Sequence, residues 1–237
     1  MNLMSMVEAI GRRNDSRLVV ALDIYSPRWS IDWLMDFLGG INKYVVGVKI
    51  GIPTILSYGL EKISGVINRY NDLLWVADVK LADIGYVGKL IVDKIYESGF
   101  NAIIIHGFTG FEDGVGETVA YASRKGLYPI IVAAMSHKGA QEYLNRVSGD
   151  IILNSLNYPV DGYILPATYR EYIAFYRGVV GNRVILSPGI GKQGAEPGSA
   201  IKYGADLEII GRLIYMDEAP ISRVRELHGV LRWRQPG

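Results

Sequence analysis

Two aspartates and one lysine stand close together in residues 78–83, which read Asp-Val-Lys-Leu-Ala-Asp. They follow the uninterrupted apolar run 74–77, which is typical of a buried strand. Because strand side chains alternate between faces, Asp78 and Lys80 are predicted to project on the same side, roughly 7 Å apart along the strand. Two carboxylates around one ammonium can hold a substrate and transfer a proton. An ion pair that only closes a strand end fits this short motif equally well.

Seven further apolar runs, with β-branched residues in many of them, are predicted strands: 17–23, 44–51, 102–107, 127–135, 162–167, 184–189 and 207–212. Helical patterns separate or follow the eight runs: from Ser26 to a stop at Gly39–Gly40, then 53–70, 87–98, 112–125, 140–157, 169–176, 199–203 and 220–233. Strands that alternate with helices form a parallel sheet, and eight strands can close it. We therefore expect an α/β fold, a single (β/α)8 TIM barrel over residues 1–237 with a short N-terminal helix in residues 1–13. An open doubly wound sheet is the alternative, although no G-x-G-x-x-G follows the first run.

The composition narrows the function classes. A net charge of +1 with 21% charged residues predicts neither nucleic-acid nor membrane binding, and the arginine-rich segment 223–234 is interpreted as the solvated face of the last helix. The longest apolar runs are too short to span a bilayer, and residues 1–13 do not resemble a signal peptide. The chain has no cysteine, which excludes disulfides and thiolate metal sites and fits a cytoplasmic location. Its three scattered histidines predict no metal cluster.

In such a barrel the C-terminal ends of the strands form the face that carries the chemistry. The polar residues expected together there are Asp23, Lys49, Asp78, Lys80, His106, Ser136, Pro188, Gly189, Gly211 and Arg212. The last two strands of a barrel often bind a phosphate, and here they carry the glycine-rich loop 187–194 and the pair Gly211–Arg212. The plainer interpretation is a turn-rich loop beside an exposed arginine.

Short segments distributed through most of the chain resemble the orotidine 5′-monophosphate (OMP) decarboxylase family: 21–23, 48–51, 78–84, 105–107, 135–140, 186–194 and 209–212. Their order and spacing carry the resemblance, because each segment alone is weak. The resemblance implies decarboxylation of OMP to UMP in pyrimidine biosynthesis, without a cofactor or a metal. It makes Lys80 the general acid that protonates C6 and places Asp78 beside the substrate carboxylate. Lys49 is then expected to hold Asp78 and the ribose hydroxyls, and Asp23 to bind the ribose.

The same resemblance implies a homodimer, in which Asp83 reaches into the partner's site with Ile84 beside it. For the remaining contacts it implies hydrogen bonding of Ser136 to the pyrimidine edge and binding of the phosphate by Gln193, Gly211 and Arg212. Pro188 and Gly189 are expected beside the pyrimidine ring. Two positions depart from the family pattern: Val87 stands where many members have threonine, and Gly85 where proline is frequent.

Two alternatives stay open. A related branch that shares the D-x-K-x-x-D motif uses Mg²⁺ and sugar phosphates, because its enediolate chemistry suits a hard cation. The second alternative is a catalytically idle barrel that binds a phosphorylated ligand. Retention of Lys49, Asp78, Lys80 and Asp83 favours an active enzyme over that barrel. His106 is interpreted as a structural histidine with its hydrogen bonds satisfied.

Overall fold

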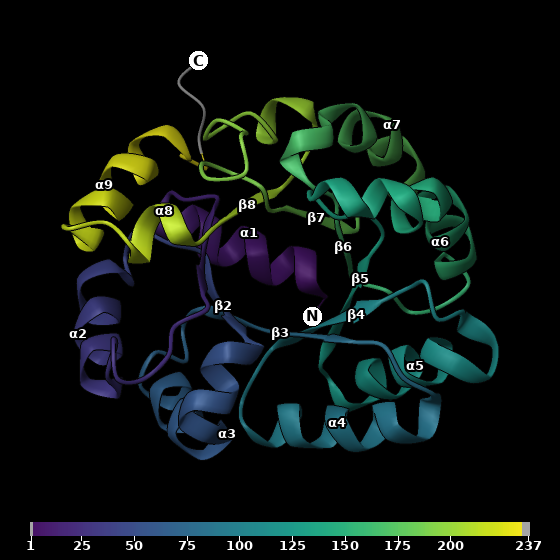
Figure 1. The fold of residues 1–237 in the computed structure, drawn as a ribbon, viewed down its shortest axis with the longest axis horizontal. Coiled ribbons are helices and arrows are strands. Elements are labelled where there is room, and N and C mark those ends of the chain that lie inside the picture. Colours follow the sequence, from purple (N-terminus) through teal and green to yellow (C-terminus); the bar gives the residue numbers. More distant parts are fainter. Residues whose placement is uncertain (1, 234–237) are drawn as a thin grey trace.

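The computed structural model describes residues 2–233 and forms a closed barrel of eight parallel strands with helices around it (Figure 1). The strands are β1 (Leu18–Leu22), β2 (Gly47–Gly51), β3 (Leu74–Leu81), β4 (Ala102–His106), β5 (Tyr128–Val132), β6 (Gly162–Ile164), β7 (Val184–Ser187) and β8 (Leu207–Ile210). Each pairs with its neighbours in sequence, and β8 pairs with β1. The predicted (β/α)8 barrel is therefore confirmed. The alternative of an open sheet is wrong, because β1 and β8 share a register from Leu18↔Glu208 to Val20↔Ile210.

The helices are α1 (Leu3–Asn14), α2 (Ile31–Ile41), α3 (Ile52–Arg69), α4 (Gly85–Glu97), α5 (Gly116–Lys125), α6 (Ser148–Ser155), α7 (Arg170–Val180), α8 (Arg212–Tyr215) and α9 (Pro220–Val230). The predicted N-terminal helix is present as α1, and its buried Leu3, Val7 and Ile10 pack with the residues that fill the barrel interior. None of the helices in the described chain is long and apolar enough to cross a membrane.

Strand alternation divides the apolar residues into two cores. In β3, Leu74 and Val76 belong to the barrel interior, whereas Trp75 and Ala77 pack in the layer between strands and helices. Asp78 continues the alternation of Leu74 and Val76 and therefore points toward the barrel interior. The strand that supplies the core thus also carries a carboxylate toward its C-terminal end. The barrel thus places charged side chains directly above its packed interior.

Several predicted helix boundaries were wrong. The second helix begins at Ile31, where the Ser30 hydroxyl accepts a hydrogen bond from the Trp33 amide (3.0 Å), and it continues through Gly39 and Gly40. A Cβ on Gly40 would lie 2.6 Å from a carbon of Ile221, so this glycine permits close packing against α9 instead of ending the helix. The helix expected from residue 112 begins at Gly116, after an irregular turn over Phe111–Val115.

The segment 140–157 is also less helical than predicted. It forms two 3-10 turns, Lys138–Glu142 and Leu144–Val147, before α6 begins. The buried side chain of Asn145 explains the break, because its amide binds both the N–H (2.9 Å) and the C=O (3.0 Å) of Met135 and thereby holds the turn against the end of β5. The short helix α8 was not predicted, and the last helix ends at Val230. Arg234 of the arginine-rich segment lies outside the described residues.

Candidate active site

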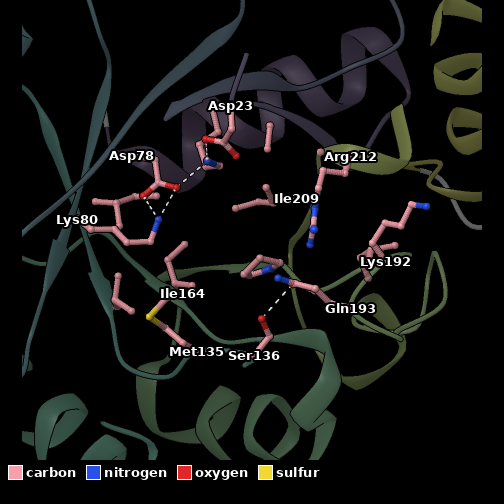
Figure 2. A pocket seen from close by; sticks show the side chains of 18 residues that line it. Asp23, Asp78, Lys80, Met135, Ser136, Ile164, Lys192, Gln193, Ile209 and Arg212 are labelled. Carbon is pink, nitrogen blue, oxygen red and sulfur yellow. Dashed lines mark hydrogen bonds and ion pairs between the residues drawn. The ribbon is translucent and has the colours of Figure 1, made fainter. Parts of the chain in front are cut away.

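A cavity of about 210 Å³ opens at the C-terminal ends of the strands. Its lining includes ten of the twelve residues predicted to act on or bind the substrate: Asp23, Lys49, Asp78, Lys80, Ser136, Pro188, Gly189, Gln193, Gly211 and Arg212. Figure 2 shows the two kinds of polar group on opposite sides, with Asp23, Asp78 and Lys80 facing Gln193 and Arg212 across apolar side chains. The cavity therefore joins a charged end to an end suited to an anion.

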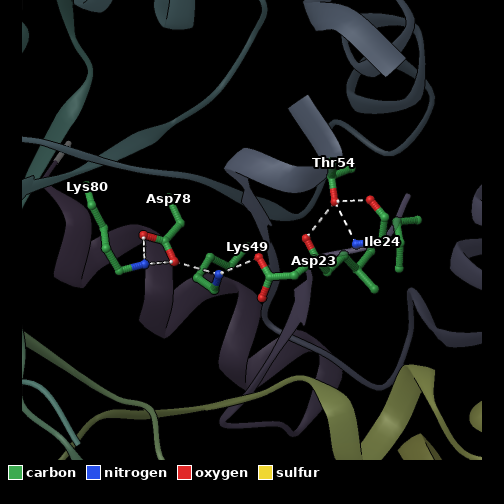
Figure 3. Close-up of polar contacts among 7 residues, drawn as sticks. Asp23, Ile24, Lys49, Thr54, Asp78 and Lys80 are labelled. Atoms are coloured by element: carbon green, nitrogen blue, oxygen red, sulfur yellow. Dashed lines mark hydrogen bonds and ion pairs between the residues drawn. The ribbon is translucent and has the colours of Figure 1, made fainter. Parts of the chain in front are cut away.

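The charged end is a connected chain of four side chains (Figure 3). Lys49 Nζ lies 2.6 Å from Asp78 Oδ2 and 3.7 Å from Asp23 Oδ1. Lys80 Nζ donates to both oxygens of Asp78, at 2.8 and 2.9 Å. The Asp78 carboxylate thus stands between two ammonium groups, and Lys49 links it to Asp23.

Burial and charge act in opposite directions on Asp78. Desolvation alone raises the pKa of this carboxyl group, whereas the nearby charges of Lys49 and Lys80 and their hydrogen bonds lower it. The charges prevail, and the pKa of Asp78 lies below its ordinary value. A carboxylate 7% exposed is therefore held ionised next to the cavity.

Lys80 reaches this position through an irregular backbone. Between the pairs Ala77↔Ile103 and Leu81↔Ile105, β3 advances four residues while β4 advances two. Lys80 lies in this bulge with φ +44°, a left-handed conformation that a lysine rarely adopts. The bulge, and not simple alternation, directs its amine back to Asp78. Strain of this kind is characteristic of functional sites.

Asp23 is positioned by contacts with the next strand and helix. The Thr54 hydroxyl of α3 donates toward Leu22 O and accepts from Ile24 N, each at 2.9 Å, and so fixes the backbone on both sides of Asp23 (Figure 3). A Cβ on Gly51 would lie 1.7 Å from Asp23 Oδ1, so any larger residue there would displace the carboxylate.

The opposite end of the cavity is formed by loops and is more exposed. Gln193 lies in the β7–β8 connection, and its Oε1 accepts a hydrogen bond (3.0 Å) from Ser136 Oγ in the loop after β5. Arg212 begins α8 directly after Gly211, and Figure 2 shows its guanidinium on the same side of the cavity as Gln193. Both side chains belong to exposed residues, as does Lys192, a third polar residue lining this end that sequence reasoning missed.

The structure does not bring every predicted residue into this cavity. Asp83 and Ile84 are exposed and do not line it, and the Asp83 carboxylate accepts a hydrogen bond from Ile84 N (2.8 Å). His106 is half-buried with its ring 4.9 Å from Phe108, and its Nδ1 is buried without a partner among the described residues. The expectation of a satisfied histidine was therefore wrong. Burial lowers the pKa of the His106 imidazole, and the positive charge of Lys80 lowers it further.

The apolar lining was also missed. Ile104, Val132, Ile164 and Ile209 are interior-facing positions near the strand ends, which alternation along each strand could have identified. Among the described residues, no group of three or more His, Cys, Asp or Glu side chains is placed to hold a metal ion.

Comparison with known proteins assigns the chain to a family. The sequence model of the orotidine 5′-phosphate decarboxylase / HUMPS family matches residues 16–227. The chain belongs to this family. Relatives named orotidine 5′-phosphate decarboxylase include those of Methanosarcina barkeri (33% identical, covering 90% of this chain and 93% of the relative) and Thermococcus kodakarensis (36%, covering 90% and 96%).

Solved structures named orotidine 5′-monophosphate decarboxylase share the fold. The enzyme of Sulfolobus solfataricus superposes with a TM-score of 0.81 at 30% identity, covering 91% of this chain and 97% of that one. The enzyme of Methanocaldococcus jannaschii, in complex with the inhibitor BMP, gives 0.81 at 28% identity, covering 91% and 98%. The matched region of the family contains every residue of the candidate site.

Proposed function

We propose that this chain is an orotidine 5′-phosphate decarboxylase that converts OMP to UMP in pyrimidine biosynthesis, with Lys80 as the acid that protonates C6. One observation carries the mechanism: Lys49, Asp78 and Lys80 form a connected array at one end of a cavity whose other end presents Gln193 and Arg212. The many relatives that bear this enzyme's name and match about nine tenths of the chain support the activity.

The polarity of the cavity orients the substrate. The phosphate of OMP binds at the exposed end, where Arg212 offers a bidentate guanidinium and Gln193 and the Gly211 N–H offer further donors. The ribose then lies near Asp23 and Lys49. Ser136 bonds the pyrimidine edge beside Pro188 and Gly189, and the ring extends toward Lys80. Binding energy at the phosphate end in this way holds the reacting carbon against charges that are already in place.

The chemistry at C6 follows from this placement. The bond between C6 and the carboxylate breaks, carbon dioxide leaves, and the electron pair stays on C6. The ammonium of Lys80 stabilises this negative charge and donates a proton to it, and the resulting amine regains a proton from solvent. Asp78 holds the Lys80 amine at 2.8 Å and places its own negative charge beside the departing carboxylate. Lys49 keeps Asp78 ionised and oriented.

The engagement of Asp78 argues against the Mg²⁺-dependent sugar-phosphate chemistry of the related branch. Both of its oxygens accept hydrogen bonds from ammonium groups, so binding a cation there requires breaking charge-assisted bonds.

The test of the proposed function follows the loss of OMP absorbance as UMP forms, with EDTA present and Lys80→Ala as the control. Conversion that survives the chelator and is lost in the variant supports the proposal. An enzyme that needs Mg²⁺, or that acts only on sugar phosphates, contradicts it.

We also propose that the active unit is a homodimer in which Asp83 completes the partner's site. Asp83 and Ile84 stand outside the cavity of their own chain, at the start of α4. Large apolar side chains are exposed directly before α4, on α4 and on α3, which lies beside α4 in Figure 1: Ile84 (60%), Tyr86 (70%), Leu90 (52%) and Leu56 (79%). Burying such a patch between two subunits favours association.

We further propose that the enzyme works in the cytoplasm. The absence of cysteine is compatible with that reducing compartment.

Mixing two inactive variants tests this arrangement. Asp83→Ala spoils the residue donated to the partner, and Lys80→Ala spoils the recipient site. After subunit exchange, a heterodimer contains one site with both defects and one with neither. Complete exchange of an equal mixture makes half of the dimers heterodimers, so up to about a quarter of wild-type activity should return. Exchange of subunits without any recovered activity, or a monomer in sedimentation with full activity, contradicts the shared site.

A further inference from the structure

Glu208 is a fully buried carboxylate on β8 with no part in the chemistry described above. Its exposed fraction is 0%. Oε2 accepts a hydrogen bond from the Gly198 N–H and Oε1 from the Ala200 N–H, each at 2.8 Å. Burial raises the pKa of Glu208, opposed by the backbone N–H groups of Gly198, Ala200 and Ile201. Burying a carboxylate in an apolar layer costs free energy unless its oxygens are hydrogen-bonded, so the bonds that Glu208 makes there indicate its role.

The bonded segment is the end of the loop that carries Gln193. That loop leaves β7 after Ser187, turns tightly over Gly189–Ala195, and returns through Gly198 and Ala200. Within the turn, Gly191 N donates to Ala195 O (2.8 Å) and Ala195 N donates to Gly189 O (3.2 Å). Gly198 has φ +83°, a conformation that turns its N–H toward the carboxylate at little steric cost because it has no side chain. The loop is therefore a compact unit whose position depends on how its two ends are fixed.

Glu208 contacts both ends. Its backbone pairs in register with Ser187, the last residue of β7 before the loop. Its side chain binds Gly198 and Ala200, where the loop closes. The same strand continues through Ile210 to Gly211 and Arg212, which line the other part of the anion-binding end. One residue thus fastens the start and the end of the Gln193 loop to the strand that carries Arg212.

We propose that Glu208 is a positioning residue for phosphate recognition, which sets the Gln193 loop in register with Arg212 through the backbone of Gly198 and Ala200. The inference rests on the proposed function, because it assigns the phosphate of the substrate to that end of the cavity. An apolar residue at this position would leave the part-buried N–H of Gly198 and the buried N–H of Ala200 without their partner. Glutamine would accept one of the two bonds and place its own NH₂ group against the other donor.

The test compares Glu208→Gln with a matched variant, Asp206→Asn. Asp206 is also a largely buried acid with a raised pKa, and it lies immediately before β8, at the opposite end of that strand from Arg212. Its carboxylate pairs with Arg177 (2.6 Å) and accepts from Ile185 N (2.8 Å), and it makes no bond to the Gln193 loop among the contacts of the described residues. Both variants replace a buried carboxyl group in or next to β8 by an amide. Only Glu208→Gln disturbs the loop.

Two inhibitors separate positioning from general damage. UMP carries the phosphate and uridine lacks it. In Glu208→Gln the inhibition constant of UMP should rise about tenfold, while that of uridine stays within about twofold of wild type. In Asp206→Asn both constants should stay within about twofold of wild type, even where the melting temperature falls. An equal loss of UMP and uridine affinity in Glu208→Gln, or no loss of either, overturns the proposal.

Amide hydrogen exchange gives a readout that does not require turnover. Exchange in the segment 189–200 should accelerate in Glu208→Gln and stay at the wild-type rate in Asp206→Asn. An unchanged exchange rate there in Glu208→Gln overturns the positioning role. The outcome is separable from the proposed function: a wild-type protein that fails to decarboxylate OMP contradicts the function, while hydrogen exchange still decides whether Glu208 holds the loop.

Discussion

The two ends of the cavity differ in the burial of their polar side chains and in the structural elements that carry them. At the charged end, Lys49 and Asp78 are 6% and 7% exposed, project from strands, and pair at 2.6 Å. At the end proposed to bind the phosphate, Gln193 and Arg212 are exposed and lie in the connections after β7 and β8. The buried pair of Lys49 and Asp78 is fixed away from solvent and orients Lys80, whose own side chain is 41% exposed. Groups that capture a ligand must remain accessible to solvent. The contrast supports the proposal that strand residues supply the chemistry and loop residues the substrate binding.

The largest effect is expected at the charged end. Lys80→Met should lower kcat by about a thousandfold, because it removes both the proton donor and the positive charge beside C6. The affinity for UMP should change far less, since the phosphate end stays intact. Steady-state kinetics and calorimetric titration with UMP measure the two quantities. Lys94→Met, at an exposed lysine of α4 paired with Glu97, serves as the control and should match wild type. A Lys80→Met enzyme that loses affinity as strongly as rate would erase the contrast between the two ends.

Arg212→Ala is expected to have a smaller effect, and on substrate affinity instead of kcat. The KM for OMP should rise about a hundredfold, because a bidentate charge-assisted contact with the phosphate is lost. The free energy of unfolding should stay close to wild type, since Arg212 is exposed. Kinetics over a wide range of OMP concentration and denaturant unfolding check the two parts. Loss of stability without a change in KM would place Arg212 in the fold and not in the binding site.

The smallest expected effect concerns acid stability at the charged end. The pKa of Asp78 in the folded chain lies below its ordinary value of 3.8, so folding favours its ionised form. The resulting stabilisation is complete above pH 3.8 and is lost as the pH falls through the lower pKa of the folded state. Asp78→Asn should therefore cost about 2 kcal/mol at pH 7 and progressively less below pH 3.8. Urea unfolding of the wild-type protein and the variant, at pH 7 and below pH 3.8, measures the difference in their free energies of unfolding. A constant difference would mean that the charge of Asp78 adds nothing to stability.

Sequence reasoning succeeded where one residue's identity and its place on a strand were sufficient. Asp23, Lys49 and Asp78 stand at the ends of apolar runs, and closure of eight strands brings such ends to one face. It failed where long-range packing decides the outcome. The glycines of α2 continue the helix because α9 packs against them, and no local pattern contains that contact.

The backbone of the site was equally inaccessible from local patterns. Lys80 meets Asp78 through a bulge with φ +44°, whereas alternation along a regular strand predicts the same proximity by a different route. Glu208 lies inside an apolar run and gave no signal, because its partners are backbone N–H groups of a loop eight to ten residues earlier. Side chains that bind backbone leave no complementary side chain in the sequence to reveal them.

The most direct measurement concerns the proton that Lys80 is proposed to deliver. A proton donor to C6 must also remove the proton from C6 in the reverse direction, so the enzyme should exchange the C6 hydrogen of a bound product for deuterium in D₂O. The 5-fluoro analogue of UMP, in which fluorine makes that hydrogen more acidic, allows the exchange to be followed by proton NMR. We predict exchange in the wild-type enzyme and in Arg212→Ala at saturating ligand, and none in Lys80→Met. Exchange at the wild-type rate in Lys80→Met would contradict the role of Lys80 as the acid.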